Sequence, residues 1–369
     1  MQLDVDTDDL HHVRSTDPPP APLSDGESRI RVDAFGLSAN NITYAAYGRL
    51  MHYWDCFPGE VDDGTTWGRV PVWGFGDVVE SATPELAEGR RLYGYFPLGD
   101  ELIVRPGRSD DQGFSDVTPS REAIPSVYAR YAFTDADRVY RPEREGQQML
   151  LWPLFVTSFV VDDFLGDNAL FGARTAVVSS ASSKTAIGAA FLLSGRDGVD
   201  VVGLTSAANL EFVRALGCYS SVLTYDQVDG LGATETCYID VAGRRDVTHA
   251  VHHRLGDDLR YSMVVGDTHW DDTGEGTGPL PGPRPEFLFA PDQITKRRSD
   301  WGRDGFEANV AEAWDRFVPW TDGWLSLRHR TGPVEVEHAY RSLLEGRVDP
   351  RIGDICTLVP GSDGEGGQS

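Results

Sequence analysis

The stretch Thr175-Ala-Val-Val-Ser-Ser-Ala-Ser-Ser-Lys-Thr-Ala-Ile-Gly-Ala-Ala-Phe-Leu-Leu, residues 175–193, decides the fold of this chain. It joins a short apolar strand, residues 175–179, to small and apolar residues at helical spacing, residues 184–193. The order repeats, because residues 199–204 are predicted as a second strand and residues 209–216 as a second helix that Gly217 ends. Further strands are predicted at residues 221–224, 236–241 and 259–265. Strands and helices that alternate at this spacing predict a parallel, doubly wound sheet.

The first part of the chain has the pattern of a β module. Ser28-Arg-Ile-Arg-Val-Asp-Ala-Phe alternates between polar and apolar positions, which predicts a strand. More short strands, separated by Gly and Pro, are predicted at residues 70–81, 90–96 and 101–105. The prolines within residues 18–22 predict a partly loose lead-in over residues 1–27, and residues 107–125 are predicted as a loop-rich insertion.

The end of the chain returns to mixed structure, with helical segments at residues 305–317 and 334–344 and a final strand at residues 355–359. A chain of 369 residues is comfortable for two domains. We therefore predict an α/β protein in which residues 1–145, with a return segment at 320–369, form a β-rich domain. Residues 146–319 form the doubly wound domain.

Composition excludes several classes of partner. The net charge of −25 argues against nucleic acid and anionic membranes, since both repel such a surface. No stretch approaches the ~20 uninterrupted apolar residues of a membrane span, and the acidic start, residues 1–9, has no apolar core of a signal peptide. We therefore expect a cytoplasmic protein whose partner is a small-molecule substrate. Only Lys184 and Lys296 are lysines among 33 basic residues, and Asp outnumbers Glu. A GC-rich coding bias explains Arg in place of Lys, a high-salt cytoplasm explains that and the Asp excess, and the sequence does not separate the two.

Several short motifs, in the correct order, resemble the medium-chain dehydrogenase/reductase superfamily over nearly the whole chain. They are Val70-Pro-Val-Trp-Gly-Phe-Gly-Asp-Val-Val-Glu, Glu88-Gly-Arg-Arg-Leu-Tyr-Gly-Tyr, Leu204-Thr-Ser to Leu216-Gly-Cys followed by residues 222–226, and Ile239-Asp-Val-Ala-Gly. The resemblance, which is to the quinone-reductase-like kind, implies a GroES-like β-rich domain and a Rossmann-type domain. It also implies a homodimer, because resembling proteins pair the edge strands of their doubly wound sheets.

Three further segments resemble one family of this superfamily that is known only as a domain of unknown function. They are Ser180-Ala-Ser-Ser-Lys-Thr-Ala, Gly203-Leu-Thr-Ser and Val265-Gly-Asp-Thr-His-Trp. This closer resemblance implies a fold but no substrate. Gly266, in the last of these segments, is a further candidate cofactor-binding residue.

The sequence predicts a protein without zinc. A catalytic zinc needs three ligands of the His, Cys or Glu type, and the His-Glu pair of zinc dehydrogenases is replaced here by Trp73-Gly74. No cysteine lies near Asn40-Asn41, and the chain's four cysteines form no Cys-x-x-Cys pair. His249, His252 and His253 share one predicted helical face, which a solvated helix explains better than a metal site.

The candidate cofactor loop lies between the first strand of the doubly wound domain and its helix. Dinucleotide sites place Gly-x-Gly-x-x-Gly there so that phosphates approach the backbone at a helix N-terminus. This chain instead has hydroxyl side chains and an ammonium group, which also bind anions. They belong to Ser180, Ser182, Ser183, Lys184 and Thr185. The alternative is a helix capped by Ser and Thr that binds no ligand.

The residues at the end of the second strand indicate whether NAD or NADP is preferred. Thr205-Ser206-Ala-Ala-Asn209 contains no carboxylate of the kind that holds the ribose diol of NAD. Tyr225 matches a tyrosine that resembling quinone reductases place beside the 2′-phosphate. NADP is therefore favoured over NAD, although no arginine accompanies this segment.

The substrate side is predicted near Asn40-Asn41-Ile-Thr-Tyr44-Ala-Ala-Tyr47-Gly, which resembles the segment lining the cleft of quinone reductases. Tyr44 or Tyr47 can donate a proton to a developing enolate. The candidate pocket residues are Asn41, His52, Tyr53 and Trp54. The alternative is that these aromatic side chains only pack the β module. His269, just after the fifth strand, is a further titratable candidate.

Together these features predict an NADP(H)-dependent reductase of an activated carbonyl, enone or quinone-like small molecule. Two alternatives stay open: a ligand-binding protein that has lost the dinucleotide, and a non-redox lyase or isomerase on the same fold. The substrate, the direction of reaction and the pathway are not predicted.

Overall fold

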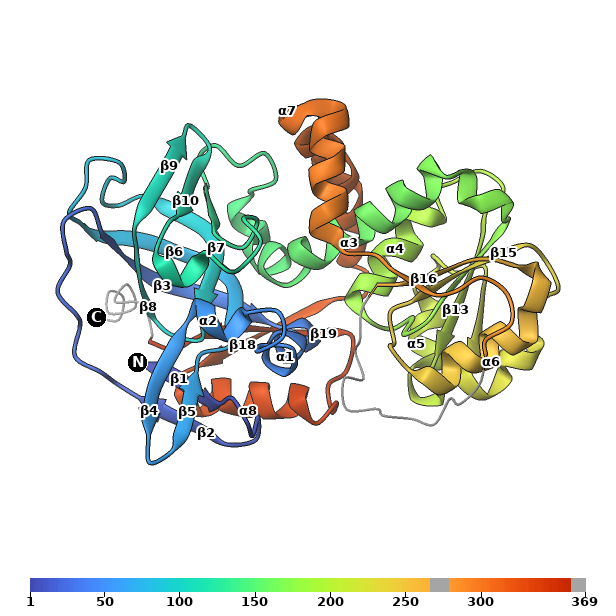
Figure 1. Ribbon diagram of the computed structural model, residues 1–369, viewed down its shortest axis with the longest axis horizontal. Coiled ribbons are helices and arrows are strands. Elements are labelled where there is room, and N and C mark those ends of the chain that lie inside the picture. The colour runs from blue at the N-terminus through green and yellow to red at the C-terminus, as the bar shows by residue number, and fades with distance from the viewer. Residues whose placement is uncertain (266–278, 360–369) are drawn as a thin grey trace, which may run out of the picture. The chain divides into compact units, whose positions relative to one another are not determined.

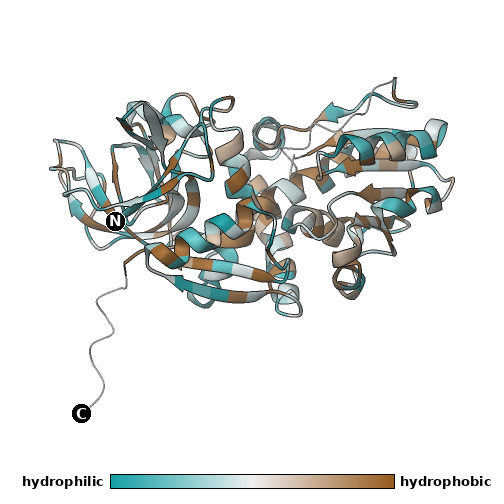
Figure 2. Cartoon of the chain, turned by 90° about the horizontal axis from the view of Figure 1, so that it is seen from below, coloured by the Kyte–Doolittle hydropathy of each residue, from teal (hydrophilic) through white to brown (hydrophobic). Residues whose placement is uncertain are grey.

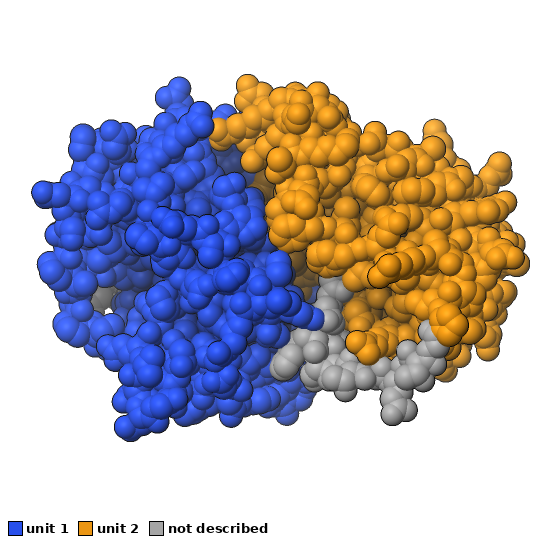
Figure 3. All heavy atoms as spheres, viewed as in Figure 1, with its two compact units in different colours: residues 1–150, 325–369 blue, residues 151–324 orange. Residues whose placement is uncertain are grey.

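The computed structural model describes residues 1–265 and 279–359. The chain divides into two units (Figure 3): Met1–Leu150 with Leu325–Ser369 form unit 1, and Leu151–Trp324 form unit 2. Unit 1 is rich in β-strands, and unit 2 contains a six-stranded parallel sheet. The predicted fold class, a GroES-like β-rich domain with a Rossmann-type domain, is confirmed.

Unit 1 is built on two sheets (Figure 1). The smaller has the order β2-β1-β5-β4, from β1 (Gln2–Asp6), β2 (Val13–Thr16), β4 (Pro58–Asp62) and β5 (Thr65–Gly68). The larger has the order β18-β19-β3-β6-β7-β11-β10-β9, with β8 paired to β3. Its strands are β3 (Ser28–Leu37), β6 (Pro71–Ser81), β7 (Arg91–Pro97), β8 (Glu101–Val104), β9 (Pro106–Asp110), β10 (Gly113–Asp116), β11 (Arg130–Phe133), β18 (Ser326–Thr331) and β19 (Ile352–Thr357). The helices of unit 1 are α1 (Ala39–Ala46), α2 (Tyr53–Cys56) and α8 (Pro333–Leu344).

Two predictions for unit 1 were wrong in part. The lead-in is not loose at its start, because β1 pairs with β2 and with β5, and Leu3 and Val5 are fully buried. The prolines all follow β2, so they do not interrupt this pairing. The insertion after Gly107 is not only loop, since β9 and β10 extend the large sheet beyond β11. Both errors concern short strands whose partners are far away in the sequence or lie in the same insertion.

Unit 2 contains the predicted parallel sheet, in the order β14-β13-β12-β15-β16-β17. Its strands are β12 (Thr175–Val178), β13 (Asp200–Thr205), β14 (Ser221–Thr224), β15 (Thr236–Asp240), β16 (Leu259–Val264) and β17 (Glu286–Phe287). Its helices are α3 (Glu145–Asp167, shared with unit 1), α4 (Lys184–Leu193), α5 (Leu210–Ala215), α6 (Arg245–Leu255) and α7 (Ala290–Thr321). In Figure 2, brown hydrophobic stretches lie on strands of this sheet and also on the helices, as expected when helices pack on a parallel sheet.

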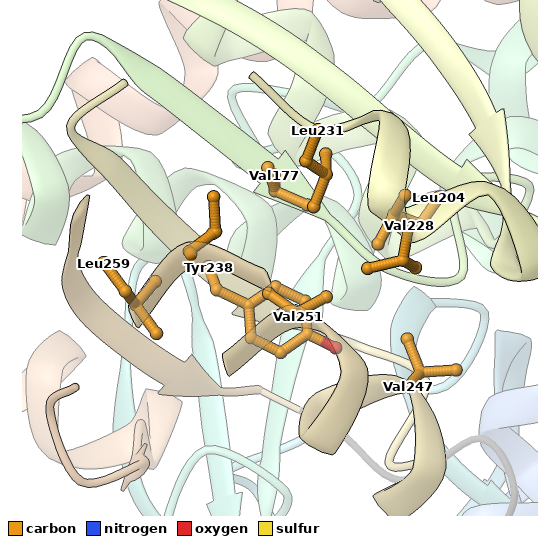
Figure 4. Packing of buried hydrophobic residues seen from close by; sticks show 9 residues of the cluster. Val177, Leu204, Val228, Leu231, Tyr238, Val247, Val251 and Leu259 are labelled. Atoms are coloured by element: carbon orange, nitrogen blue, oxygen red, sulfur yellow. The ribbon is translucent and has the colours of Figure 1, made fainter. Parts of the chain in front are cut away.

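One face of this sheet packs on α6 (Figure 4). Tyr238 of β15 lies among Val177, Leu204 and Val251, and all four side chains are essentially inaccessible to solvent. The remaining members of this cluster are Val228, Leu231, Val247, Leu255 and Leu259. A separate set of aromatic rings joins α3 to α7, with the rings of Phe155 and Phe317 stacked 4.6 Å apart. The close packing of these apolar strands therefore fixes the positions of the loops that follow their carboxyl ends.

Two helices of unit 2 differ from the prediction. The apolar run at residues 149–161 lies inside α3, a helix that the sequence analysis did not predict, and Pro153 is within it. The segment Pro142–Asp167 is long and apolar enough to cross a membrane by length and composition alone, but half of its apolar window is buried, as in core helices of soluble proteins. Helix α7 begins 15 residues before the predicted start at Gly305, with a break in helical geometry at Gly302.

The histidines of α6 do not all face solvent as predicted. His252 is fully buried, with Nδ1 2.8 Å from the Pro281 carbonyl oxygen and Nε2 2.9 Å from the Ser262 hydroxyl. Nδ1–H therefore donates to the carbonyl, and Nε2 accepts from the hydroxyl. His249 and His253 lie together on the other side of the helix, with their Nε2 atoms 3.1 Å apart. The pattern of one helix could not show that the sheet covers His252.

Lowering the pH from 7.5 to 5 is expected to destabilise the protein partly through His252. Burial lowers the pKa of His252 from its ordinary value of 6.5. The unfolded chain then binds a proton that the folded chain refuses, so stability is lost as the pH falls below about 6.5, by at most ~1.4 kcal/mol per pH unit. The measurement is the midpoint of urea unfolding across this range. His252→Gln should show a shallower loss than the wild type.

Candidate functional site

The loop between β12 and α4 contains one residue in a left-handed conformation and leads into a helix N-terminus, and it carries side chains where dinucleotide sites have glycines. Ser180 has a φ of +50°, a left-handed conformation that glycine adopts more easily. Ser183 is the N-cap of α4, and its hydroxyl accepts a hydrogen bond from the Ala186 N–H at 3.3 Å. Lys184 is the first helical residue, so its ammonium group starts from the positive end of the helix dipole. The loop therefore has two features that favour anions, the helix N-terminus and the ammonium group, and one feature that needs no ligand, the cap formed by Ser183.

Neighbouring strand ends hold this loop in place. The Ala181 N–H donates to the Leu204 carbonyl at 3.0 Å, and the Tyr219 hydroxyl donates to the Ala181 carbonyl at 2.9 Å. The Asn209 side-chain amide donates to the Ser182 hydroxyl at 3.0 Å. The predicted cofactor residues from two strand ends, Ser182 and Asn209, are thus brought into direct contact.

Residues 205–209, at the end of β13, include no Asp or Glu. Thr205 is buried, and Ser206 and Asn209 are partly exposed. Tyr225, which follows β14, reaches back to the loop, because the Ser180 N–H donates to its hydroxyl at 3.2 Å. Burial raises the pKa of Tyr225, so the ring remains a neutral phenol. The structure therefore gathers Ser180, Ser182, Asn209 and Tyr225 at one edge of the sheet.

A buried carboxylate organises the turn after β15. Asp240 is 4% exposed, and its Oδ1 accepts from the Ser179 hydroxyl at 2.7 Å and from the N–H groups of Ala242 and Gly243, both at 3.1 Å. Its Oδ2 accepts from the Thr248 hydroxyl at 2.8 Å. Burial raises the pKa of Asp240, and these donors oppose that rise. We call Asp240, Ser179, Thr248 and this turn the Asp240 knot.

The Asp240 knot leads directly into Arg244, a residue that the sequence reading did not select. Gly243 has a φ of +70°, and the next residue places its guanidinium carbon 5.1 Å from the centre of the Tyr225 ring. The signal in the sequence was an arginine directly after Asp-Val-Ala-Gly, but nothing in the sequence places it beside a tyrosine from another strand end.

In unit 1, four tyrosines and a tryptophan form a cluster that is buried except for Tyr128, which is partly exposed. The Trp73 indole N–H donates to the Tyr44 hydroxyl at 3.1 Å, and the Tyr53 and Tyr128 hydroxyls lie 3.3 Å apart. Tyr95 stands at the centre, with its ring 5.4 Å from that of Tyr44 and 5.1 Å from that of Tyr128. The Tyr95 hydroxyl is buried and has no hydrogen-bond partner among residues 1–265 and 279–359. The sequence predicted only Tyr44 and Tyr53 of this tyrosine cluster.

A protein-family model described as "Protein of unknown function (DUF2855)" matches residues 35–349. The chain belongs to this family. No curated protein matches it.

Members of the medium-chain dehydrogenase/reductase superfamily are similar to this DUF2855 chain in structure. CurA from Vibrio vulnificus in complex with NADPH is 14% identical with a TM-score of 0.62, over 98% of this chain and 99% of that one. The YhdH oxidoreductase from Salmonella enterica in complex with NADP is 14% identical with a TM-score of 0.52, over 94% and 95%. Haloferax mediterranei glucose dehydrogenase in complex with NADP, Zn and gluconolactone is 10% identical with a TM-score of 0.53, over 98% and 99%. Likeness at this level of identity shows the fold.

The position of the zinc dehydrogenases' His-Glu pair has no space for an acidic side chain in this DUF2855 protein. A Cβ atom added at Gly74 would lie 2.4 Å from the Ala34 carbonyl oxygen, because β3 and β6 approach closely there. Trp73, in place of the histidine, is part of the tyrosine cluster. Within residues 1–265 and 279–359, no group of three His, Cys, Asp or Glu side chains is placed to hold a metal. A zinc-free protein stays our prediction.

The remaining predicted residues are placed as follows. Asn41 is the buried N3 residue of the α1 capping box, and its side chain accepts from the Ser38 N–H and donates to the Pro71 carbonyl, both at 2.8 Å. Trp54 is buried against Gly48 and Gly68, where any added Cβ would strike the indole. Tyr47 is partly exposed at the end of α1, and His52 is exposed and paired with Asp55 at 2.8 Å. Thr185 follows Lys184 in α4, while Gly266 and His269 lie outside the described residues.

Proposed function

We propose that this protein is an NADP(H)-dependent reductase of a small molecule that contains an activated carbonyl, enone or quinone-like group. The loop of residues 180–185, held at the N-terminus of α4 by Tyr219, Tyr225 and Asn209, carries the proposal. Helix N-termini bind phosphate through N–H groups and the helix dipole. The similar folds of CurA with NADPH and YhdH with NADP support a dinucleotide at this edge of the sheet.

The choice of NADP rests on the charges at the strand ends. An acidic residue after β13 would repel a 2′-phosphate, and residues 205–209 contain none. Tyr225 contacts the loop by a hydrogen bond, and it matches a tyrosine that resembling quinone reductases place beside the 2′-phosphate. Ser206→Asp should therefore weaken the binding of NADPH more than that of NADH.

The proton for such a reduction would come from the tyrosine cluster. A bound nicotinamide supplies a hydride, and the reduced carbonyl or enolate then needs a proton. Burial raises the pKa of Tyr44 well above its usual value of 10.0, so this residue holds its proton until a stronger base, such as an enolate, is beside it. The Trp73 N–H donates to the Tyr44 oxygen and would stabilise the phenolate left behind. Tyr47 and His269 remain alternative donors.

A second candidate function is a non-redox enzyme or a ligand-binding protein. The observation that favours it is the capping of α4 by the Ser183 hydroxyl, which satisfies one free N–H of the helix with no ligand. We also propose a cytoplasmic homodimer that is formed through an edge of the parallel sheet, with a small-molecule substrate and neither nucleic acid nor membrane as partner.

Titration of the purified protein with NADPH and NADH by calorimetry tests the proposed function. NADPH is expected to bind more tightly than NADH, and Ser206→Asp should reduce that preference. If the wild type binds neither nucleotide at millimolar concentration, the reductase proposal is wrong and the second candidate replaces it.

A further inference from the structure

We propose that Arg244 is the residue that recognises the 2′-phosphate of the dinucleotide. The end of β13, where such an arginine is expected, has none. Arg244 follows β15 instead, on the other side of β12 in the sheet. The inference rests on the proposed function and adds the specificity-determining residue that it lacks.

A chain of contacts joins Arg244 to the candidate phosphate loop. The Ser180 N–H donates to the Tyr225 hydroxyl at 3.2 Å, and the Arg244 guanidinium carbon lies 5.1 Å from the centre of the same ring. β14 and β15 are separated in the sheet by β13 and β12, so the Tyr225 side chain bridges the strand ends between them. A tyrosine ring that binds a guanidinium on its face and a backbone N–H at its hydroxyl is suited to hold that cation in one place.

The backbone that carries Arg244 is also fixed. The Asp240 knot holds the N–H groups of Ala242 and Gly243, and Gly243 takes the left-handed conformation that turns the chain into α6. Arg244 is the N-cap residue of that helix and is partly exposed. Because the backbone of this turn is already ordered, Arg244 loses less conformational entropy when it binds a phosphate than an arginine on a mobile loop would lose.

The ion pair of Arg244 is compatible with this role. Its Nε lies 3.1 Å from Asp246 Oδ1 and its second terminal nitrogen lies 2.5 Å from Oδ2. The Asp246 side chain is 54% exposed, and exposed ion pairs of this kind are weak. A phosphate dianion binds the planar guanidinium fork more strongly than an exposed carboxylate does, so it can replace or share this partner.

The net charge of the protein is a further reason to expect a cation beside the 2′-phosphate. A protein with a net charge of −25 repels an anionic ligand at long range, so a nearby cation is needed to favour the nucleotide that carries the extra phosphate. Arg245, the next residue, is exposed and carries the same charge. Substitution of Arg245 therefore distinguishes a specific contact of Arg244 from a general effect of positive charge.

Calorimetric titration of wild type, Arg244→Ala and Arg245→Ala with NADPH, NADH and 2′,5′-ADP tests the proposal. We expect Arg244→Ala to weaken NADPH and 2′,5′-ADP by about ten- to hundredfold, with NADH changed less than about threefold. Arg245→Ala should change none of the three by more than about threefold, and Arg244→Lys should recover part of the loss. Melting temperatures of the variants check that the fold is intact.

The outcomes separate this inference from the proposed function. If the wild type prefers NADPH but Arg244→Ala weakens NADPH and NADH equally, Arg244 only supports the loop and the proposal is overturned. An equal loss in Arg245→Ala also overturns it, because the effect is then one of general charge. If the wild type binds none of the three probes, the proposed function itself fails.

Discussion

Lys184→Ala is expected to weaken NADPH binding by about ten- to hundredfold while leaving the melting temperature nearly unchanged. Lys184 is the first residue of α4, beside a loop in which serine side chains replace the usual glycines. The phosphate contacts that those glycines normally allow must then be made by hydroxyls and the ammonium group. One charge-assisted hydrogen bond contributes about 1.5–3 kcal/mol, which corresponds to this change in the dissociation constant.

The chain offers a matched control for this variant. Lys296 is its other lysine, and it is exposed on α7 and paired with Asp300 at 2.8 Å. Lys296→Ala removes the same charge and should leave NADPH binding unchanged. With only two lysines, reductive methylation followed by mass spectrometry can also show whether NADPH protects Lys184 alone. Equal protection of both lysines, or wild-type affinity in Lys184→Ala, would rule out a direct contact.

Asp240→Ala is expected to lower the free energy of unfolding by about 3 kcal/mol. The carboxylate accepts hydrogen bonds from two hydroxyls and two backbone N–H groups, and alanine leaves these buried donors without their acceptor. An unsatisfied buried group costs about 1–3 kcal/mol, and rotation of the Ser179 and Thr248 hydroxyls recovers part of the loss. For a unit of this size the melting temperature should fall by about 6–12 °C.

Thermal unfolding followed by circular dichroism measures this effect. Asp226→Ala is the control, because Asp226 is an exposed carboxylate just after Tyr225 in the same unit. Its removal should change the melting temperature by less than about 2 °C. A change equally small in Asp240→Ala would mean that the Asp240 knot does not stabilise the fold. A stable Asp240→Ala variant should still show a weaker preference for NADPH, since the turn before Arg244 would then be less ordered.

The sequence by itself determined the doubly wound sheet. Strands β12 to β16 are short apolar runs that alternate with helical segments, and both patterns are local properties of the chain. Apolar strands of this kind need helices on both faces, so the order of elements was enough to predict the architecture. The loop at residues 180–185 was found for the same reason, since it lies between one strand and one helix.

The tertiary structure decided which residues complete the sites. His252 has the sequence context of a solvated helix, yet the sheet buries it. β1 pairs with β5 although the partners Asp6 and Trp67 are 61 positions apart in the sequence, and Trp73 reaches Tyr44 from another element. Arg244 meets Tyr225 only because parallel strands bring their carboxyl ends to one edge, where side chains from β14 and β15 can meet. Periodicity shows which face of an element is buried, but side-chain packing between distant elements selects the neighbours of each buried group.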